Sequence, residues 1–440
     1  MSLVLDHVCV TLSFIVLLFL TCFFTSSNGT PLQNSFKVFR INLESERELD
    51  ILKSLYENAH DYSLDFWKPP TKAGTFSDLM VPWKMTSNIT ALLTTNNITY
   101  NVIISDVSQL MREEEISIKR KNYSFGTELG SFFRRFNDES SKNKAKYNFE
   151  EYGSYTQMTD WMKNIQIHYP SFTKVFQIGK THDGRFIEGI KIGNAINDTK
   201  KRAVWIDGGI HAREWAAMHT ALYFINELVS NYGSDPTISK YVDSINFYIV
   251  PCLNPDGYEF SFSATDNPMQ YETGSNSNPC SYNYQGRKPF SEPESSALRD
   301  MLLSPELKGK TDAYITMHTY AQFWMYPWGN RPDSYTEDFA ELKTVAEEAA
   351  EALKSSYGTK YKTGTGADLL YSASGASGDW AKDTAKVKYA YVLELRPASA
   401  LNGFILNKNE LLPTAKETWV GVKVVIDAVL RLNGLQQKVT

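Results

Sequence analysis

From about residue 147 to residue 435, short apolar runs alternate with segments in which apolar residues recur every three or four positions. Runs such as RAVWIDG, INFYIVP, AYITMH and YAYVLEL have the length of buried strands, whereas AMHTALYFINELVSNY and TVAEEAAEALKSSY have the helical period. Apolar strands separated by helices are typical of a parallel or mixed sheet that helices cover on both faces. We therefore predict an α/β domain over residues 147–435, with a mixed, largely parallel central sheet whose ligands bind where strands end.

A smaller folded unit is predicted over residues 36–120. FKVFRI and ITYNVII have the pattern of strands, and ESERELDILKSLYENA and DVSQLMREEEISIKR that of helices, which together indicate a small α+β domain with split βαβ topology. Residues 121–146 are polar and lack apolar periodicity, so we expect an exposed linker of the kind that proteases cut. Its basic residues include Arg134, Arg135, Lys142, Lys144 and Lys146.

The N-terminus begins with a nearly unbroken apolar run over residues 8–24, followed by TSSNGT. This pattern is typical of a secretory signal peptide, which we place at residues 1–29 and expect to be cleaved from a secreted, extracellular protein. Asp6 and His7 stand where Lys or Arg is usual, and the run approaches the length of a short anchor, so membrane attachment stays open if the segment is uncleaved. Four Asn-x-Ser/Thr sequons also fit a secreted glycoprotein: Asn88, Asn97, Asn122 and Asn197.

Composition and charge narrow the classes of partner. A hydrophobic content of 42% allows a substantial core in a chain of 440 residues. The net charge of −5 and the lack of a long basic block argue against binding to nucleic acid or to an anionic membrane surface. Outside the predicted leader only Cys252 and Cys280 remain; they could form one disulfide but are too few for a disulfide scaffold.

Candidate metal ligands follow two of the strand-like runs. The stretch HARE comes after VWIDGG and before a helical pattern, and a helix beginning there would put His211 and Glu214 on one face. His318, at the polar end of AYITMH, is the candidate third ligand. Two imidazoles and one carboxylate with an open fourth position are typical of catalytic zinc. Glu394, at the end of YAYVLEL, could then act as a general base.

Structural roles for the same residues remain open at this point. A His-x-x-Glu pair arises often by chance, and a histidine after a strand can simply be hydrogen-bonded in the core. Glu394 could equally form an ion pair with Arg396 or another cation. His182 and His219 match no ligand spacing, and we interpret both as structural.

Eight longer phrases, in order, cover nearly all of residues 147–430: GRFIEGIKIG, DGGIHAREW, LNPDGYEFS, GRKPFSEPES, MHTYAQFWMYPWG, YSASGASGDW, KYAYVLELR and LPTAKETWVGV. They resemble the zinc metallocarboxypeptidases of the pancreatic A/B type in their secreted zymogen form. KVFRI, LDFW and NNITYNVIISDV, within residues 36–120, are similar to the family's inhibitory activation propeptide. The resemblance implies hydrolysis of the C-terminal peptide bond of peptides or proteins, one Zn²⁺ ion, and an activating protease that cuts within residues 134–146.

The same resemblance assigns roles within the site. The implied zinc ligands are His211, Glu214 and His318, and Glu394 would promote the water that attacks the peptide bond. Tyr371 would fold over the bound C-terminal residue. The other implied substrate-binding residues are Arg213, Tyr320, Gly378 and Phe404.

Gly378 bears on the side-chain preference, because it matches the base of the family's specificity pocket. An aspartate there would select C-terminal Lys or Arg, and a bulky aliphatic residue marks the A-type enzymes. Since glycine offers no carboxylate to a basic side chain, we expect apolar or aromatic C-terminal residues.

One stretch departs from the family pattern. Residues 258–286 contain no Arg, Lys or His, whereas family members carry there an arginine that stabilises the oxyanion, an Asn-Arg pair that grips the terminal carboxylate, and an aspartate that orients a zinc-binding histidine. Losing an oxyanion donor costs on the order of a hundredfold in rate. Cys280 matches half of a family disulfide whose partner would lie in the absent stretch, so it is free or paired with Cys252. The alternative reading is therefore a zinc-binding pseudoenzyme or peptide-binding protein with little activity.

Overall fold

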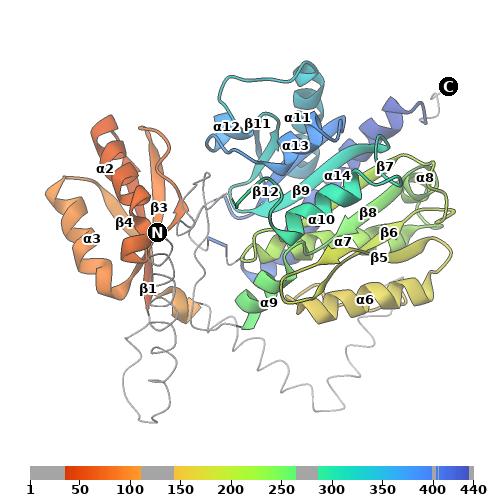
Figure 1. Ribbon diagram of the computed structural model, residues 1–440, viewed down its shortest axis with the longest axis horizontal. Coiled ribbons are helices and arrows are strands. Elements are labelled where there is room, and N and C mark those ends of the chain that lie inside the picture. The colour runs from red at the N-terminus through yellow and green to blue at the C-terminus, as the bar shows by residue number, and fades with distance from the viewer. Residues whose placement is uncertain (1–34, 111–142, 264–285, 399–402, 405, 436–440) are drawn as a thin grey trace, which may run out of the picture.

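The computed structural model describes residues 35–110, 143–263, 286–398, 403–404 and 406–435, which form the two units of Figure 1. The predicted signal peptide, the linker up to residue 142 and the unusual stretch over residues 264–285 lie outside these ranges. Within the described residues, no helix combines the length and the apolar composition needed to cross a membrane.

The small unit, orange in Figure 1, is a four-stranded antiparallel sheet with two helices. Its elements are β1 (Phe36–Leu43), α2 (Glu46–Glu57), β2 (Asp65–Lys68), β3 (Thr75–Pro82), α3 (Trp83–Thr95) and β4 (Tyr100–Ile104). The strand order β2-β3-β1-β4 confirms the predicted α+β unit. Ser45 starts α2 with a capping box, in which its hydroxyl accepts from the backbone N–H of Glu48 and the Glu48 carboxylate accepts from the N–H of Ser45.

The large unit is built on an eight-stranded sheet with the order β11-β10-β12-β9-β7-β8-β6-β5. Its strands are β5 (Thr173–Lys180), β6 (Phe186–Ile192), β7 (Ala203–Gly208), β8 (Asn246–Val250), β9 (Thr311–Thr319), β10 (Phe323–Tyr326), β11 (Lys362–Thr365) and β12 (Tyr389–Leu395). The central strands β12, β9, β7 and β8 run parallel. Strand β6 pairs antiparallel with β8 and with β5, and β10 pairs antiparallel with β12. The mixed sheet predicted from the apolar runs is thereby confirmed.

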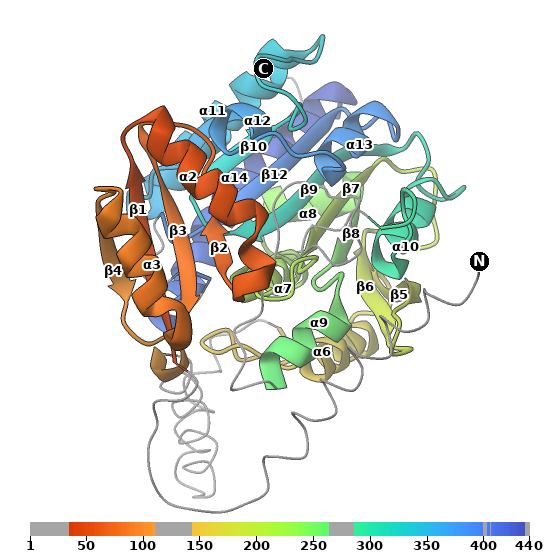
Figure 2. The same ribbon diagram turned by 60° about the vertical axis from the view of Figure 1, so that its left-hand side comes forward.

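Helices cover both faces of this sheet, as the two views in Figures 1 and 2 show. Val204 and Ile206 of β7 point into the core that includes α6 (Tyr155–His168), α7 (Trp215–Asn231), α8 (Pro236–Ser244), α11 (Phe339–Tyr357) and α14 (Lys408–Leu432). Ala203 and Trp205 alternate with them and point into the core beneath α10 (Pro293–Leu302) and α13 (Ser377–Asp383). The remaining short helices are α9 (Pro255–Ser263) and α12 (Gly366–Leu369). Because both faces are buried, the central strands read as apolar runs.

Candidate active site

The first two candidate ligands lie on a turn between β7 and α7. Gly209 begins this turn with φ +68°, and an ideal Cβ at this position would lie 2.7 Å from Met218 Cγ, so glycine is required by both conformation and space. The N–H of Glu214 donates to the carbonyl of His211 at 3.2 Å. Helix α7 begins at Trp215, four residues after His211, so the prediction that a helix puts His211 and Glu214 on one face is wrong. His211 and Glu214 therefore meet across a turn, not along a helix.

Three side chains from two strand ends converge here. His211 Nδ1 lies 2.9 Å from Glu214 Oε1, and His318 Nδ1 lies 2.9 Å from Glu214 Oε2. The two imidazole Nδ1 atoms are 3.2 Å apart. Glu214 is the N-cap residue of α7, but its side chain makes no capping bond and points to the two histidines instead.

Burial and charge act in opposite directions on Glu214. Burial raises the pKa of its carboxyl, but the adjacent His211 and His318 outweigh this and lower it to about 2. The carboxylate is therefore ionised at any physiological pH. An ionised carboxylate buried with two imidazoles is a favourable place for a cation.

The donor set fits zinc. One atom from each of His211, Glu214 and His318 can be chosen so that all three lie within 4.8 Å of one another. A catalytic zinc ion typically has three protein ligands and a fourth position open to solvent or substrate. Two imidazole nitrogens and one carboxylate oxygen are such a set of three. Within the described residues this is the group of side chains that meets the requirements of a metal site. These three residues would hold the ion.

Glu394 lies beside this centre on the adjacent strand. Strands β12 and β9 are parallel, and their register puts Glu394 opposite His318. Burial raises the pKa of the Glu394 carboxyl well above its ordinary value, and the charge of Glu214 raises it further. A cation held by the three ligands would act in the opposite direction and favour the ionised, proton-accepting form. Its Oε2 atom is buried and has no hydrogen-bond partner among the described residues. Arg396 bonds to Glu417 on α14, so the alternative ion pair between Glu394 and Arg396 is not formed.

Arg213 is occupied by the small domain. Its Nη1 donates to Asp65 Oδ2 of β2 at 2.8 Å, and its guanidinium lies over the ring of Phe404, with Cζ 3.9 Å from the ring centroid. Only 2% of the Asp65 side chain and 14% of the Arg213 side chain are exposed. The pair is a charge-assisted hydrogen bond, and because it is shielded from water, removing either charge would leave the other one buried and uncompensated.

The neighbouring contacts extend this cover over the site. The ring of Trp67, also on β2, packs edge-on against Phe404 with ring centroids 5.6 Å apart. Tyr320 follows β9 on the large-domain side of the interface, and its hydroxyl lies 3.4 Å from Asp78 Oδ2 of β3 in the small domain. Asp78 in turn accepts two hydrogen bonds from Arg40, each at 2.8 Å.

Gly378 and Tyr371 lie farther along the chain. Gly378 is buried in α13, and an ideal Cβ there would lie 2.9 Å from Val392 Cγ2. Val392 and Glu394 alternate with Leu393 along β12, so Gly378 packs on the same face of the sheet that carries Glu394. Tyr371 follows α12 and is partly exposed. The structure thus brings together the three ligands, Glu394, Arg213, Tyr320 and Phe404, and puts Gly378 on their side of the sheet.

Sequence reasoning missed the small-domain side of the interface. Asp65 and Trp67 lie within the phrase LDFW, and Asp78 lies in a strand that the sequence reading did not single out. An aspartate in an apolar strand pattern signals a partner, since a buried carboxylate needs one. Nothing in the sequence identifies that partner, because Arg213 is 148 positions away from Asp65.

Comparisons with known proteins agree with this geometry. Residues 158–421 match the family model of the zinc carboxypeptidases, and residues 39–114 match that of the carboxypeptidase activation peptide. Carboxypeptidase A2 of Rattus norvegicus is 33% identical over 421 residues, which cover 89% of this chain and 93% of the relative. Carboxypeptidase B of Astacus astacus is 37% identical over 304 residues, covering 63% of this chain and 97% of the relative.

Solved structures show the same fold. The crystal structure of thrombin activatable fibrinolysis inhibitor superposes with a TM-score of 0.75 at 26% identity, over 90% of this chain and 99% of that one. Carboxypeptidase A from Helicoverpa armigera gives a TM-score of 0.76 at 22% identity, over 91% and 99% of the two chains. The chain belongs to the zinc carboxypeptidases, as a metallocarboxypeptidase that carries its activation peptide.

Proposed function

We propose that this protein is made as a secreted zymogen and, once cleaved, removes the C-terminal residue from peptides or proteins. The observation that carries the proposal is the position of Glu394, whose unpartnered carboxylate oxygen lies on the strand next to His318. A buried carboxylate without a partner is costly unless it serves a function at that place. Here a proton-accepting group stands beside a complete set of zinc ligands.

The residues of the chain divide the chemistry among them. When bound, zinc acts as a Lewis acid and makes water a stronger nucleophile near neutral pH. Glu394 accepts the proton of the attacking water and passes it to the leaving amine. Arg213 donates hydrogen bonds to the carboxylate or carbonyl of the substrate. Tyr371 covers the bound residue and excludes solvent.

The Asp65–Arg213 pair supports an inhibitory role for residues 36–120. The carboxylate of Asp65 binds the guanidinium that a substrate carboxylate would otherwise reach, and Trp67 covers Phe404. A substrate therefore cannot reach Arg213 until the small domain leaves. Cleavage within residues 134–146 by an activating protease would separate it from the catalytic domain, which we place at residues 147–435.

Gly378 supports a preference for apolar or aromatic C-terminal residues. It adds no charge to the face of β12 that carries Val392 and Glu394, so a basic side chain would find no carboxylate from this position. We further propose a signal peptide over residues 1–29, N-glycosylation and an extracellular location, on the basis of the apolar N-terminal run and the four sequons.

A second candidate function rests on the composition of residues 258–286. This stretch has no cationic residue that could stabilise an oxyanion. The chain can therefore bind zinc and peptides and yet hydrolyse the peptides slowly. The deciding experiment uses purified, linker-cleaved protein and blocked dipeptides that end in Phe, Leu or Lys, with and without a zinc chelator. We expect chelator-sensitive release of Phe and Leu. Folded, zinc-loaded protein that releases none of them would instead identify a binding protein.

A further inference from the structure

The chain enters the large domain through a segment that is bonded to it along its length. We call residues 143–149 the N-terminal anchor. Asn143 is 1% exposed, and its side-chain Nδ2 donates to Asn226 Oδ1 of α7 at 2.9 Å. Its own Oδ1 accepts from the backbone N–H of Ala145 at 2.9 Å. One asparagine therefore ties the start of the anchor both to α7 and to itself.

The next bonds fix the backbone between the two lysines. The N–H of Lys144 donates to the hydroxyl of Tyr169 at 2.8 Å, and the carbonyl of Ala145 accepts from Trp161 Nε1 at 3.1 Å. Ala145 itself is 4% exposed. The side chains of Lys144 and Lys146 are exposed, but the peptide groups between them are held against the domain.

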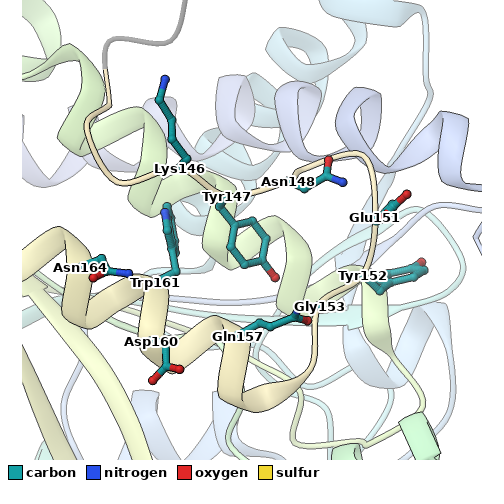
Figure 3. A pocket seen from close by; sticks show the side chains of 10 residues that line it. All are labelled: Lys146, Tyr147, Asn148, Glu151, Tyr152, Gly153, Gln157, Asp160, Trp161 and Asn164. Atoms are coloured by element: carbon teal, nitrogen blue, oxygen red, sulfur yellow. The ribbon is translucent and has the colours of Figure 1, made fainter. Parts of the chain in front are cut away.

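Aromatic packing completes the anchor. The ring of Tyr147 lies 5.0 Å from that of Trp161 and 5.1 Å from that of Phe149. Tyr147 and Trp161 are among the residues that line a groove of about 320 Å³. Figure 3 shows their rings next to each other. The carbonyl of Phe149 accepts a hydrogen bond from His219 Nε2 at 2.8 Å. Both ends of the anchor are therefore hydrogen-bonded to α7.

We propose that the N-terminal anchor prevents the activating protease from cutting after Lys144 or Lys146, so that the mature catalytic domain begins at or before Asn143. A protease binds the residues on both sides of the scissile bond in extended form, so cutting after either lysine requires the anchor to leave the domain first. Opening the anchor breaks the hydrogen bonds described above and exposes the packed rings of Tyr147 and Trp161, which makes the open form rare. The proposal rests on the proposed activation by cleavage, and it selects among the basic residues of the linker.

The test is limited digestion of the full-length chain with trypsin, followed by mass measurement of the stable fragment over time. Trypsin cuts after Lys or Arg, so the sequence alone allows cutting after every basic residue of the linker, including Lys144 and Lys146. We expect the persistent fragment to begin at or before Asn143. A persistent fragment that begins at Ala145 or Tyr147 would overturn the proposal. Because the readout is a mass, a correct boundary in a protein that hydrolyses no dipeptide would refute the proposed function and leave this inference standing.

Two variants test the cause separately. Asn143→Ala removes the bonds to Asn226 and Ala145, and Trp161→Phe removes the bond to the Ala145 carbonyl while keeping an aromatic ring. Cutting after Lys144 and Lys146 should become about tenfold faster in each, since proteolysis follows the population of the open form. Asp160→Ala, on the exposed side of α6, is the matched control and should not change the rate. Unchanged cutting in both Asn143→Ala and Trp161→Phe, with circular dichroism confirming that they fold, would show that the anchor does not protect these bonds.

Discussion

Asp65 and Arg213 form a hydrogen-bonded ion pair of 2.8 Å that joins the small domain to the turn carrying the zinc ligands. Arg213 lies between His211 and Glu214 in sequence, so the small domain holds the segment that a substrate must approach. We expect Asp65→Asn to weaken this cover, because removing one charge of a buried pair leaves the other uncompensated. The uncleaved variant should hydrolyse a blocked dipeptide ending in Phe at least roughly tenfold faster than the uncleaved wild type.

The control for this prediction is Asp61→Asn, which changes an exposed carboxylate of the same domain. It should leave the uncleaved chain as inactive as the wild type. Since the cleaved enzymes no longer carry the small domain, they should have equal rates. Equal rates for uncleaved Asp65→Asn and wild type would mean that the ion pair does not contribute to inhibition.

Metal binding should depend on all three ligands. His318→Ala removes one nitrogen donor and should lower zinc affinity by more than roughly a hundredfold, since even residues that only hydrogen-bond to metal ligands contribute about 10–100-fold. Zinc content after dialysis, measured by atomic absorption, should fall from about one ion per chain to near zero, while circular dichroism stays unchanged. Retention of a full zinc equivalent by a folded His318→Ala protein would exclude His318 as a ligand.

Acid should destabilise the large domain through His219. Burial lowers the pKa of this imidazole from 6.5 to about 4, and it outweighs the hydrogen bond from Nε2 to the Phe149 carbonyl, which acts in the opposite direction. The buried Nδ1 has no hydrogen-bond partner among the described residues, so a second proton there would be unsatisfied. The unfolded chain therefore takes up a proton between pH 6.5 and 4 that the folded chain does not, so stability is full above pH 6.5 and falls towards pH 4. A shift of this size corresponds to about 3 kcal/mol.

This prediction is checked by urea unfolding of the large domain at several pH values, with His219→Gln as the comparison. The glutamine can donate to the same carbonyl but does not titrate over this range. The difference in unfolding free energy between the two proteins should therefore change by about 3 kcal/mol from pH 7 to pH 4. Parallel pH curves for the two proteins would show that His219 is not responsible.

The packing of Gly378 leads to a prediction on stability. Its ideal Cβ lies 2.9 Å from Val392 Cγ2, so Gly378→Val overfills the contact between α13 and β12. We expect a loss of about 1–3 kcal/mol in unfolding free energy, and Val392→Ala in the same chain should restore most of it. Additive effects of the two substitutions would show that these residues do not share a tight contact.

The parts of the account that the sequence predicts are those with short-range signals. The apolar runs of β7, β9 and β12 identify strands because both faces of the sheet are buried, and polar residues at their ends mark the site. His211, Glu214 and His318 could be selected because metal ligands must be particular residue types. The start of α7 was less certain, since Glu214 serves the site instead of capping the helix.

Long-range pairings could not be read from the chain. The partner of Arg213 comes from the other domain, and no local pattern links it to Asp65. The anchoring role of Asn143 is hidden for the same reason: the residue stands in a polar stretch, and only the fold brings Asn226 to it. Such contacts depend on the completed tertiary structure, which brings together residues that lie far apart in the sequence.

The most direct test of the account is the comparison of Glu394→Gln with wild type, in linker-cleaved protein, by measuring zinc content and dipeptide hydrolysis in the same samples. Glutamine keeps the shape of the side chain but cannot accept the proton, so hydrolysis of the Phe-ending dipeptide should fall by about 10²–10⁴-fold while zinc content stays the same. Glu410→Gln, on the partly exposed start of α14, should keep wild-type activity. A zinc-loaded Glu394→Gln protein that hydrolyses the dipeptide at the wild-type rate would contradict the assignment of the active site.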